Sequence, residues 1–300
     1  MDERGRGRAG AAVAVTDATR TRDRRAERAA ARRRRNRRGA AIAAVSTVVV
    51  IGGLTALILT SPGWPAVRDT FLDWDQFKDS FPDILKAFWL DIKTFAAVEV
   101  GVLLIGLVVA LTRVTRSPAL FPFRLLAVAY TDVFRGVPTI LVIYVVGFGT
   151  PALVNAEGSS FSWLPTDPVV LGGIALALSY GAYVAEVYRA GLRSVHPGQR
   201  QAALAVGLTE SQAMRHVILP QAVRNVGPPL LNDFIALLKD IALISILGVA
   251  GEAFYTAQID ASTNFDYTPL PAAALIYLVL TIPLARLLDR WDDRQSGRAR

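Results

Sequence analysis

The chain of 300 residues is 52% apolar and only 19% charged, a composition typical of membrane proteins. It contains no cysteine and only two histidines, which excludes disulfides, thiol chemistry and a metal site built from histidines alone. The net charge of +8 is concentrated in the first 40 residues, which hold 14 arginines and carry +9, so that the rest of the chain carries −1.

Residues 1–39 form a basic tail that is rich in arginine and alanine and poor in large apolar residues, which predicts disorder. A basic tail can bind nucleic acid or anionic lipid. We favour a simpler interpretation, in which the tail fixes the topology by staying in the cytoplasm. The uncharged segment 40–60 follows and is long enough to span a bilayer. It is too long for a signal peptide and therefore predicts an N-terminal anchor helix that runs from inside to outside.

The polar segment 61–85, rich in proline, aspartate and tryptophan, predicts an external connector. Five apolar segments after it predict membrane spans, at 94–112, 125–148, 168–185, 229–250 and 268–285. With external loops at 150–167 and 251–267, positive charge falls on the cytoplasmic side at nearly every turn. The predicted fold is an all-α membrane protein with six transmembrane helices: one anchor plus a five-helix core within 86–290. A cytoplasmic tail, 291–300, follows.

One polar segment between these spans, residues 196–222, predicts a cytoplasmic helix-turn-helix. Gly207 suits the left-handed position that ends a helix. Thr209 with Gln212 is the pattern of a capping box, which opens a second helix. Pro220 is expected to end that helix.

This loop resembles a known family. Permease subunits of bacterial ABC importers carry Glu-Ala-Ala, three residues, glycine, nine further residues and then Ile-x-Leu-Pro. The corresponding residues here are Gln201, Ala202, Ala203, Gly207, Leu219 and Pro220. Motifs similar to the polar amino-acid branch stand at 134–138 (FRGVP), 188–191 (YRAG), 220–224 (PQAVR) and 238–240 (LKD). Two departures are Gln201 in place of the usual glutamate, and residues 241–243 (IAL) in place of a Thr/Ser-Ser-Leu run.

The resemblance implies the permease subunit of an ATP-driven importer for polar amino acids, and glutamate-type permeases are the most similar. It implies that the six loop residues couple to a separate ATPase dimer, which binds ATP and Mg²⁺, so that this chain has no cofactor of its own. The implied partners are a second permease subunit, of the same or a sister chain, an extracellular amino-acid-binding protein, and lipid, with no nucleic acid. The implied location is a bacterial inner or plasma membrane, with both termini in the cytoplasm.

Charged side chains inside apolar spans are costly unless they meet a partner or a wet cavity, so they are candidates for the substrate path. The candidates are Glu99, Arg135, Glu186, Lys239 and Asp240. Asp132 lies three residues before Arg135, and Arg189 lies three residues after Glu186. Each pair can therefore form an ion pair on its own helix, with a ligand contact as the alternative.

Pro138 lies inside the second core span and lacks the N–H that would bond the carbonyl of Phe134, so a kink is expected near mid-bilayer. A freed carbonyl there is tolerated where it meets protein or lines a cavity. Glu99, Lys239 and Asp240 have no opposite charge three or four residues away. Each must turn to another helix, to water or to the substrate. An ion pair between helices, such as Lys239 with Glu99, is the simplest of these, and a role in the cavity is the alternative.

Two alternatives belong to other classes of protein. A membrane-anchored DNA-binding regulator could use the helix-turn-helix and the arginine-rich tail. However, the motif lies on short tethers between spans, and its second helix offers only Arg215 as a fixed cation. A membrane-embedded enzyme would need a catalytic set, and the chain has no G-x-S-x-G, H-E-x-x-H or phosphate-binding G-x-x-x-x-G-K-[ST] pattern.

Overall fold

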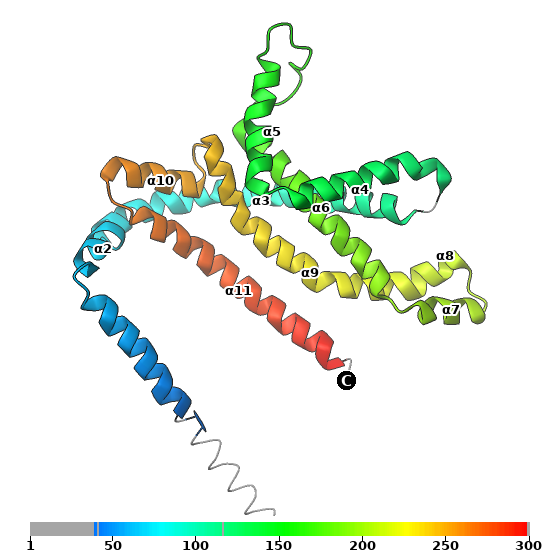
Figure 1. Cartoon of the computed structure of the whole chain (residues 1–300), viewed down its shortest axis with the longest axis horizontal. Coiled ribbons are helices and arrows are strands. Elements are labelled where there is room, and N and C mark those ends of the chain that lie inside the picture. The colour runs from blue at the N-terminus through cyan, green and yellow to red at the C-terminus, as the bar shows by residue number, and fades with distance from the viewer. Residues whose placement is uncertain (1–38, 41, 116, 299–300) are drawn as a thin grey trace, which may run out of the picture. The chain divides into compact units, whose positions relative to one another are not determined.

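The structure is a computed structural model that describes residues 39–298, apart from 41 and 116. The predicted disorder of the basic tail therefore concerns residues outside the described part. Every regular element in the described part is a helix, which confirms the prediction of an all-α protein (Figure 1). The chain forms two units, residues 1–67 and 68–300.

An apolar helix occupies the segment of the first unit that was predicted as the anchor. Residues Ile42–Leu59 of this helix are long and apolar enough to cross a membrane, and none of them is buried. A short helix, α2 (Trp64–Phe71), follows and runs across the boundary into the second unit. Pro65 lies in its first turn, where a missing N–H costs nothing because that N–H would have no intrahelical partner.

The longest helix, α3 (Trp74–Val114), begins well before the span predicted at 94–112. Asp73 caps it, because its carboxylate accepts hydrogen bonds from the N–H groups of Asp75 and Gln76 at 2.8 and 3.0 Å. The predicted connector 61–85 is therefore largely helical. Its polarity reflects exposure to water and not a loop, a distinction that composition alone does not make.

A sharp break replaces the kink expected at Pro138. The predicted span 125–148 divides into α4 (Phe121–Gly136), which follows the 3₁₀ turn η1 (Pro118–Leu120), and α5 (Thr139–Val154). The two helices are bent by 107° and leave their junction in different directions (Figure 1). The reason is local: Val137 has φ −96° and ψ 132°, because the residue before a proline avoids the helical region, and Pro138 has ψ 132° as well.

Four helices in the described residues are long and apolar enough to cross a membrane, or five if the bent pair counts as one span. They are the anchor helix, α3, α6 (Pro168–Ser194) and α11 (Pro269–Arg298). The span predicted at 229–250 is not among them, because it divides between α9 (Leu219–Asp240) and a 3₁₀ helix, η3 (Ile241–Leu247). The number of six spans therefore stays a prediction. α11 also continues through most of the predicted tail 291–300.

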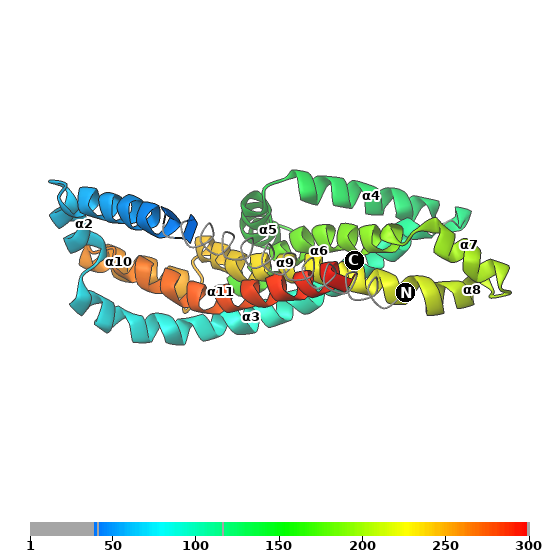
Figure 2. The same ribbon diagram turned by 90° about the horizontal axis from the view of Figure 1, so that it is seen from below.

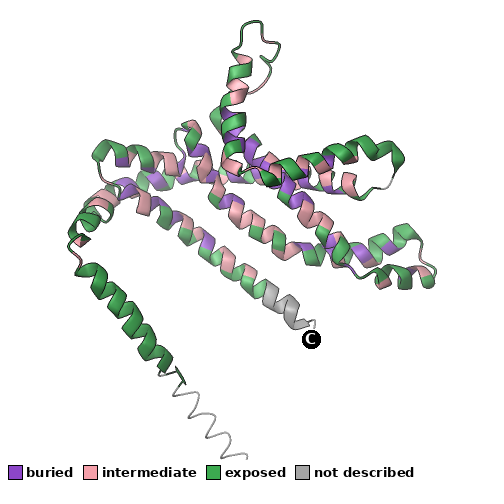
Figure 3. Ribbon diagram, viewed as in Figure 1, coloured by how far each residue is buried: buried purple, intermediate pink, exposed green. Residues whose placement is uncertain are grey.

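The centre of the second unit is α6, which packs against α3, α4, α5 and α9. It begins at the predicted residue 168, where the side chain of Asp167 accepts hydrogen bonds from the first turn. The approach of α3 is close at Gly106, since a Cβ there would lie 2.6 Å from Cγ1 of Val184. The buried residues, purple on the ribbon in Figure 3, concentrate where these helices meet.

A second, smaller core joins the first half of α3 to the last two helices. It is formed by α10 (Ala253–Asn264), α11 and α3, with α3 and α11 running side by side in Figure 2. Most of its buried residues are small alanines of α10 and α11, so these helices pack closely there. This core positions the segment that the sequence predicts to lie outside the membrane.

Candidate coupling loop and charged residues of the transport path

The predicted helix-turn-helix forms with the predicted local chemistry. α7 (Pro197–Ala205) ends at Gly207, whose φ of +89° is left-handed, and Leu208 N–H donates to the carbonyl of Ala203 at 3.1 Å. α8 (Glu210–Ala213) opens with a capping box: Gln212 N–H donates to Thr209 Oγ1 at 3.3 Å, and Thr209 N–H donates to Gln212 Oε1 at 2.9 Å.

The expectation that Pro220 ends the second helix is wrong. α8 continues into a short π-helix, η2 (Met214–Ile218), and then into α9. Leu219 N–H bonds the carbonyl of Met214, five residues back. In an unbroken α-helix the ring of Pro220 would clash with the carbonyl of residue 216, and one wide turn just before the proline avoids that clash. Leu219 and Pro220 therefore begin a long helix and do not end a short one.

Exposure separates the six predicted coupling residues into two groups. Gln201, Ala202, Gly207, Leu219 and Pro220 are exposed and free to meet another protein. Ala203 is only 5% exposed and is the buried residue of α7, which packs against α8 and η2. The small size of Ala203 therefore serves packing within the loop, and its part in coupling to the ATPase stays a prediction.

An ion pair that the sequence analysis missed bridges the two helices of the loop. Arg200 Nε donates to Glu210 Oε2 at 2.9 Å, and a second nitrogen of the same guanidinium bonds Oε1. The two residues are ten apart in sequence, so they lack the spacing of three or four residues by which an ion pair on one helix can be predicted. Beside the turn, the apolar side chain of Val206 is 79% exposed.

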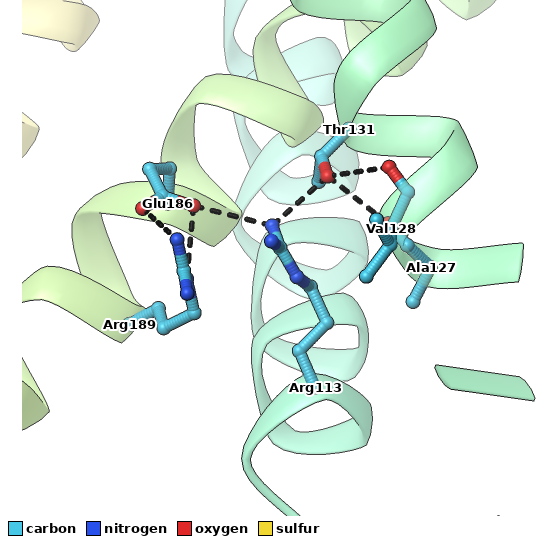
Figure 4. Close-up of polar contacts among 6 residues, drawn as sticks. All are labelled: Arg113, Ala127, Val128, Thr131, Glu186 and Arg189. Atoms are coloured by element: carbon cyan, nitrogen blue, oxygen red, sulfur yellow. Dashed lines mark hydrogen bonds and ion pairs between the residues drawn. The ribbon is translucent and has the colours of Figure 1, made fainter. Parts of the chain in front are cut away.

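A charged network joins three helices near the start of the loop (Figure 4). The predicted ion pair of Glu186 with Arg189 is confirmed, with Arg189 Nε 3.0 Å from Glu186 Oε2. Glu186 also accepts from Arg113 Nη1 of α3 at 3.1 Å. The same nitrogen donates to Thr131 Oγ1 of α4 at 2.9 Å, and Thr131 bonds carbonyls of its own helix. The side chain of Arg113 is only 11% exposed, so the network is largely shielded from solvent.

The predicted pair of Asp132 with Arg135 is absent from the part of the chain that the structure describes. The Arg135 guanidinium instead lies 5.8 Å from the centre of the Tyr183 ring, as a cation–π contact between α4 and α6. Arg135 is in the last turn of α4, where it is exposed and free to turn toward the neighbouring helix. Of the five path candidates, Arg135 and Glu186 lie close enough to interact electrostatically.

The other three candidates do not meet one another. Asp240 accepts a hydrogen bond from the Tyr180 hydroxyl at 2.8 Å. Lys239 is exposed and forms no ion pair with Glu99, so the expected pairing of these two is wrong. The charged neighbour of Glu99 is another carboxylate, Asp233 of α9.

Asp233 was not among the candidates for the substrate path, although it lies within the span predicted at 229–250. Its Oδ2 atom is buried and has no hydrogen-bond partner among the described residues. Glu99 and Asp233 thus place two half-buried, unpaired carboxylates on α3 and α9. No group of three or more possible metal-ligand side chains occurs in the part of the chain searched, residues 39–298 with the two gaps.

Comparison with known proteins agrees with this architecture. Residues 102–297 match the family described as binding-protein-dependent transport system inner membrane component. The probable amino-acid permease protein YxeN of Bacillus subtilis is 36% identical over 226 residues, which cover 75% of this chain and 96% of YxeN. The arginine transport system permease protein ArtQ of the same organism is 32% identical over 213 residues, which cover 71% of this chain and 92% of ArtQ.

A solved structure described as an amino acid ABC transporter with histidines aligns with a TM-score of 0.65 at 31% identity, covering 74% of this chain and 99% of that one. The family match at residues 102–297 includes the helix-turn-helix, the Glu186 network and the bent α4–α5 pair. The chain belongs to the family of binding-protein-dependent transport system inner membrane components.

Proposed function

We propose that this chain is the permease subunit of an ABC importer for polar amino acids, driven by a separate ATPase dimer that binds ATP and Mg²⁺. The observation that carries the proposal is the exposed helix-turn-helix between α6 and α9, with its left-handed glycine at the turn. Family membership supports an importer, and relatives named as amino-acid, arginine and glutamine permeases support the substrate class. The absence of a phosphate-binding loop from the sequence supports an ATPase on another chain.

The mechanism follows from the connection of the loop to the spans. Closure of the ATPase dimer on nucleotide moves α7 and α8, which dock in its groove through exposed residues such as Gln201 and Ala202. α8, η2 and α9 are continuous, so this movement passes directly into α9, which packs on α6 and α11. The path between the two permease subunits then alternates between inward-open and outward-open forms.

The Glu186 network holds three helices together during this movement. Arg113 and Thr131 tie α3 and α4 to α6 beside the loop, so the three helices move together. α9 has no part in this network. It meets α6 through apolar contacts and through two hydrogen bonds, from Asn225 Nδ2 to Ser194 Oγ at 2.8 Å and from the Tyr180 hydroxyl to Asp240 Oδ2 at 2.8 Å. A rearrangement of α9 against this three-helix group is therefore the expected conformational step.

The substrate is an amino acid that carries no net negative charge. The sequence resemblance favours glutamate slightly, yet Glu99 and Asp233 are unpaired carboxylates that attract an ammonium or guanidinium group and repel a second carboxylate. Glutamine and the cationic amino acids fit this charge better than glutamate. The names of the relatives, which include arginine and glutamine permeases, support the same choice.

The remaining assignments follow from the same family. A second permease subunit, either a copy or a sister chain, completes the path, and an extracellular binding protein delivers the amino acid. The protein resides in the bacterial inner or plasma membrane, with both termini in the cytoplasm as the charge distribution favours. A DNA-binding regulator is not supported, because α8 has four residues and merges into α9, which leaves no separate recognition helix.

The test is transport by the reconstituted complex. The full chain is co-purified with its ATPase, placed in vesicles with the external binding protein, and assayed for uptake of labelled arginine, glutamine and glutamate with and without ATP. We expect ATP-dependent uptake, and we expect Glu99→Gln and Asp233→Asn to reduce arginine uptake more than glutamine uptake. Glu157→Gln, an exposed carboxylate in the loop before α6, is the matched control. Uptake that ignores ATP overturns the importer, and a preference for glutamate overturns the substrate assignment.

A further inference from the structure

Two fully buried carboxyl groups lie together at the start of α10, away from the coupling loop and from Glu99 and Asp233. Glu252, the residue that caps α10, is 0% exposed, and Asp91 of α3 is 1% exposed. The Tyr277 hydroxyl lies between them, 2.8 Å from Asp91 Oδ2 and 3.5 Å from Glu252 Oε1, so the two carboxyl groups are close neighbours. Neither belongs to the family-like loop, and the sequence analysis singled out neither of them.

The hydrogen bonds of the pair tie three helices together. Glu252 Oε1 and Oε2 accept from the N–H groups of Phe254 and Tyr255 at 2.9 and 2.6 Å. Asp91 Oδ2 accepts from the Tyr277 hydroxyl of α11 at 2.8 Å, and Asp91 Oδ1 accepts from Ala253 N–H at 3.4 Å. Asp91 therefore connects α3 both to the first turn of α10 and to α11.

Within the part of the chain that the structure describes, no positive side chain compensates this pair. α3 contributes Asp91, α11 contributes Tyr277, α10 contributes backbone N–H groups, and η3 contains no titratable residue. The hydrogen bonds and ion pairs of the described residues bring no lysine, arginine or histidine to either carboxyl group. Two negative charges at such a distance in a buried site strongly repel each other, and carboxyl pairs of this kind hold one proton between them.

Burial, together with the negative charge of Asp91, raises the pKa of Glu252 from its ordinary value of 4.5 to about 8. The direction agrees with the geometry, because a proton on one carboxyl turns repulsion into a hydrogen bond. We propose that Asp91 and Glu252 share one proton, and that this proton fastens the start of α10 to α3 and α11. This contact between Asp91 and Glu252 responds to pH independently of the coupling loop.

The consequence lies on the face formed by α10 and the first part of α3. A cavity of about 560 Å³ opens there, lined among others by Gln76, Asp79, Asp83, Gly251 and Asp260. Gly251 directly precedes Glu252, so a shift of the cap moves the cavity wall. The proton therefore controls the shape of an acidic surface on the segment predicted to face the outside.

The sign of the pH effect follows from linkage. In a lifted form, in which the start of α10 separates from α3 and α11, Glu252 is exposed to water and its pKa returns toward 4.5. The seated form, in which α10 packs as in the structure, therefore binds the proton more tightly than the lifted form. Seating is strongest below the ordinary pKa, weakens as pH rises between 4.5 and about 8, and levels off above that. Within this window the lifted population rises by at most about tenfold per pH unit.

The test measures hydrogen exchange of the α10 amides in the reconstituted full-length complex, between about pH 5 and pH 9, after correction for the intrinsic exchange rate. In the wild type, protection of residues 253–264 falls as pH rises and then levels off. Glu252→Gln keeps a neutral cap that accepts from the backbone and donates to Asp91, so its protection stays high and flat. Asp91→Asn is the second variant if the first one does not assemble. Glu157→Gln, an exposed carboxylate, keeps the wild-type profile.

A flat wild-type profile overturns the proposal, and so does a Glu252→Gln profile that follows the wild type. An independent readout is the infrared band of a protonated buried carboxyl group, which the wild type shows at neutral pH and which Glu252→Gln loses. Persistence of that band in Glu252→Gln also overturns the proposal. Neither measurement depends on which substrate the complex carries or on whether it transports at all.

Discussion

Nη1 of Arg113 lies 3.1 Å from Oε2 of Glu186, although 73 residues separate them in the chain. The contact ties the C-terminal end of α3 to α6, and Thr131 extends it to α4. Because Glu186 also holds Arg189, one carboxylate neutralises two guanidinium groups in a poorly hydrated place. The arrangement is therefore sensitive to the loss of Glu186 above all.

Replacement of Glu186 by glutamine is expected to destabilise the protein more than replacement of Arg113 by methionine. Glu186→Gln leaves two cations without a counter-charge, whereas Arg113→Met leaves Glu186 still paired with Arg189. A lost hydrogen bond to a charged group costs about 1.5–3 kcal/mol, and the glutamine variant loses more than one. Thermal unfolding of the purified complex in detergent measures both variants. Equal melting temperatures for the two would contradict this ranking.

Gly207→Val is expected to separate ATP hydrolysis from transport while the protein still inserts. The φ of +89° at Gly207 penalises any Cβ, by about 1–2 kcal/mol or more for a branched side chain. The turn is therefore expected to distort and to change the orientation of α8 relative to α7. Gln201→Ala is expected to act only mildly, since its amide provides no charge-assisted bond to the ATPase. ATPase activity and uptake are compared in vesicles.

Ala205→Val controls for added bulk, because Ala205 is exposed on α7 with an ordinary helical backbone. The steric account of the loop fails if Gln201→Ala abolishes coupling and Gly207→Val preserves it.

Lys239→Met combined with Glu99→Gln is expected to show additive losses of uptake. The two residues do not pair, so neutralising both does not relieve either one. Uptake of labelled arginine by the two single variants and the double variant forms a complete mutant cycle. Recovery of wild-type uptake in the double variant would reinstate an ion pair between them.

Deletion of residues 1–59 is expected to spare assembly with the ATPase while lowering the efficiency of membrane insertion. The helix at Ile42–Leu59 lies in the first unit and outside residues 102–297, which carry the family match. Co-purification of the ATPase with the truncated chain is the measurement. Loss of the ATPase from truncated protein that is stably inserted would assign the anchor a role in assembly.

Local chemistry explains what the sequence predicted well. Gly207 and the Thr209–Gln212 capping box involve residues at most a few positions apart, and the structure confirms both. The start of α6 after Asp167 is a similar case. The bond of Glu186 to Arg189 is three residues long on one helix and was equally visible.

Contacts between distant residues explain what was missed. Arg113 reaches Glu186 across two helices, and Asp91 reaches the cap of α10 from 162 residues away, so neither has a spacing that sequence analysis can detect. Arg135 had a partner at the right local spacing, yet the ring of Tyr183 offered a better surface once the helices were packed. Pro220 misled for another reason: a proline ends a helix only if the preceding turn cannot widen.

The wide turn at η2 has a mechanical consequence. From Glu210 to Asp240 the chain stays helical without an intervening loop, although Pro228 and Pro229 inside α9 each remove a helical hydrogen bond. At 1.5 Å per residue this helical segment is about 45 Å long, comparable to a whole bilayer with its headgroups. If the helix had ended at Pro220, a flexible break there would have absorbed part of any movement that an ATPase transmits to the loop. Under the proposed function, a movement of α7 and α8 is transmitted along this helical segment into α9. Its far end is Asp240, which is held by the Tyr180 hydroxyl.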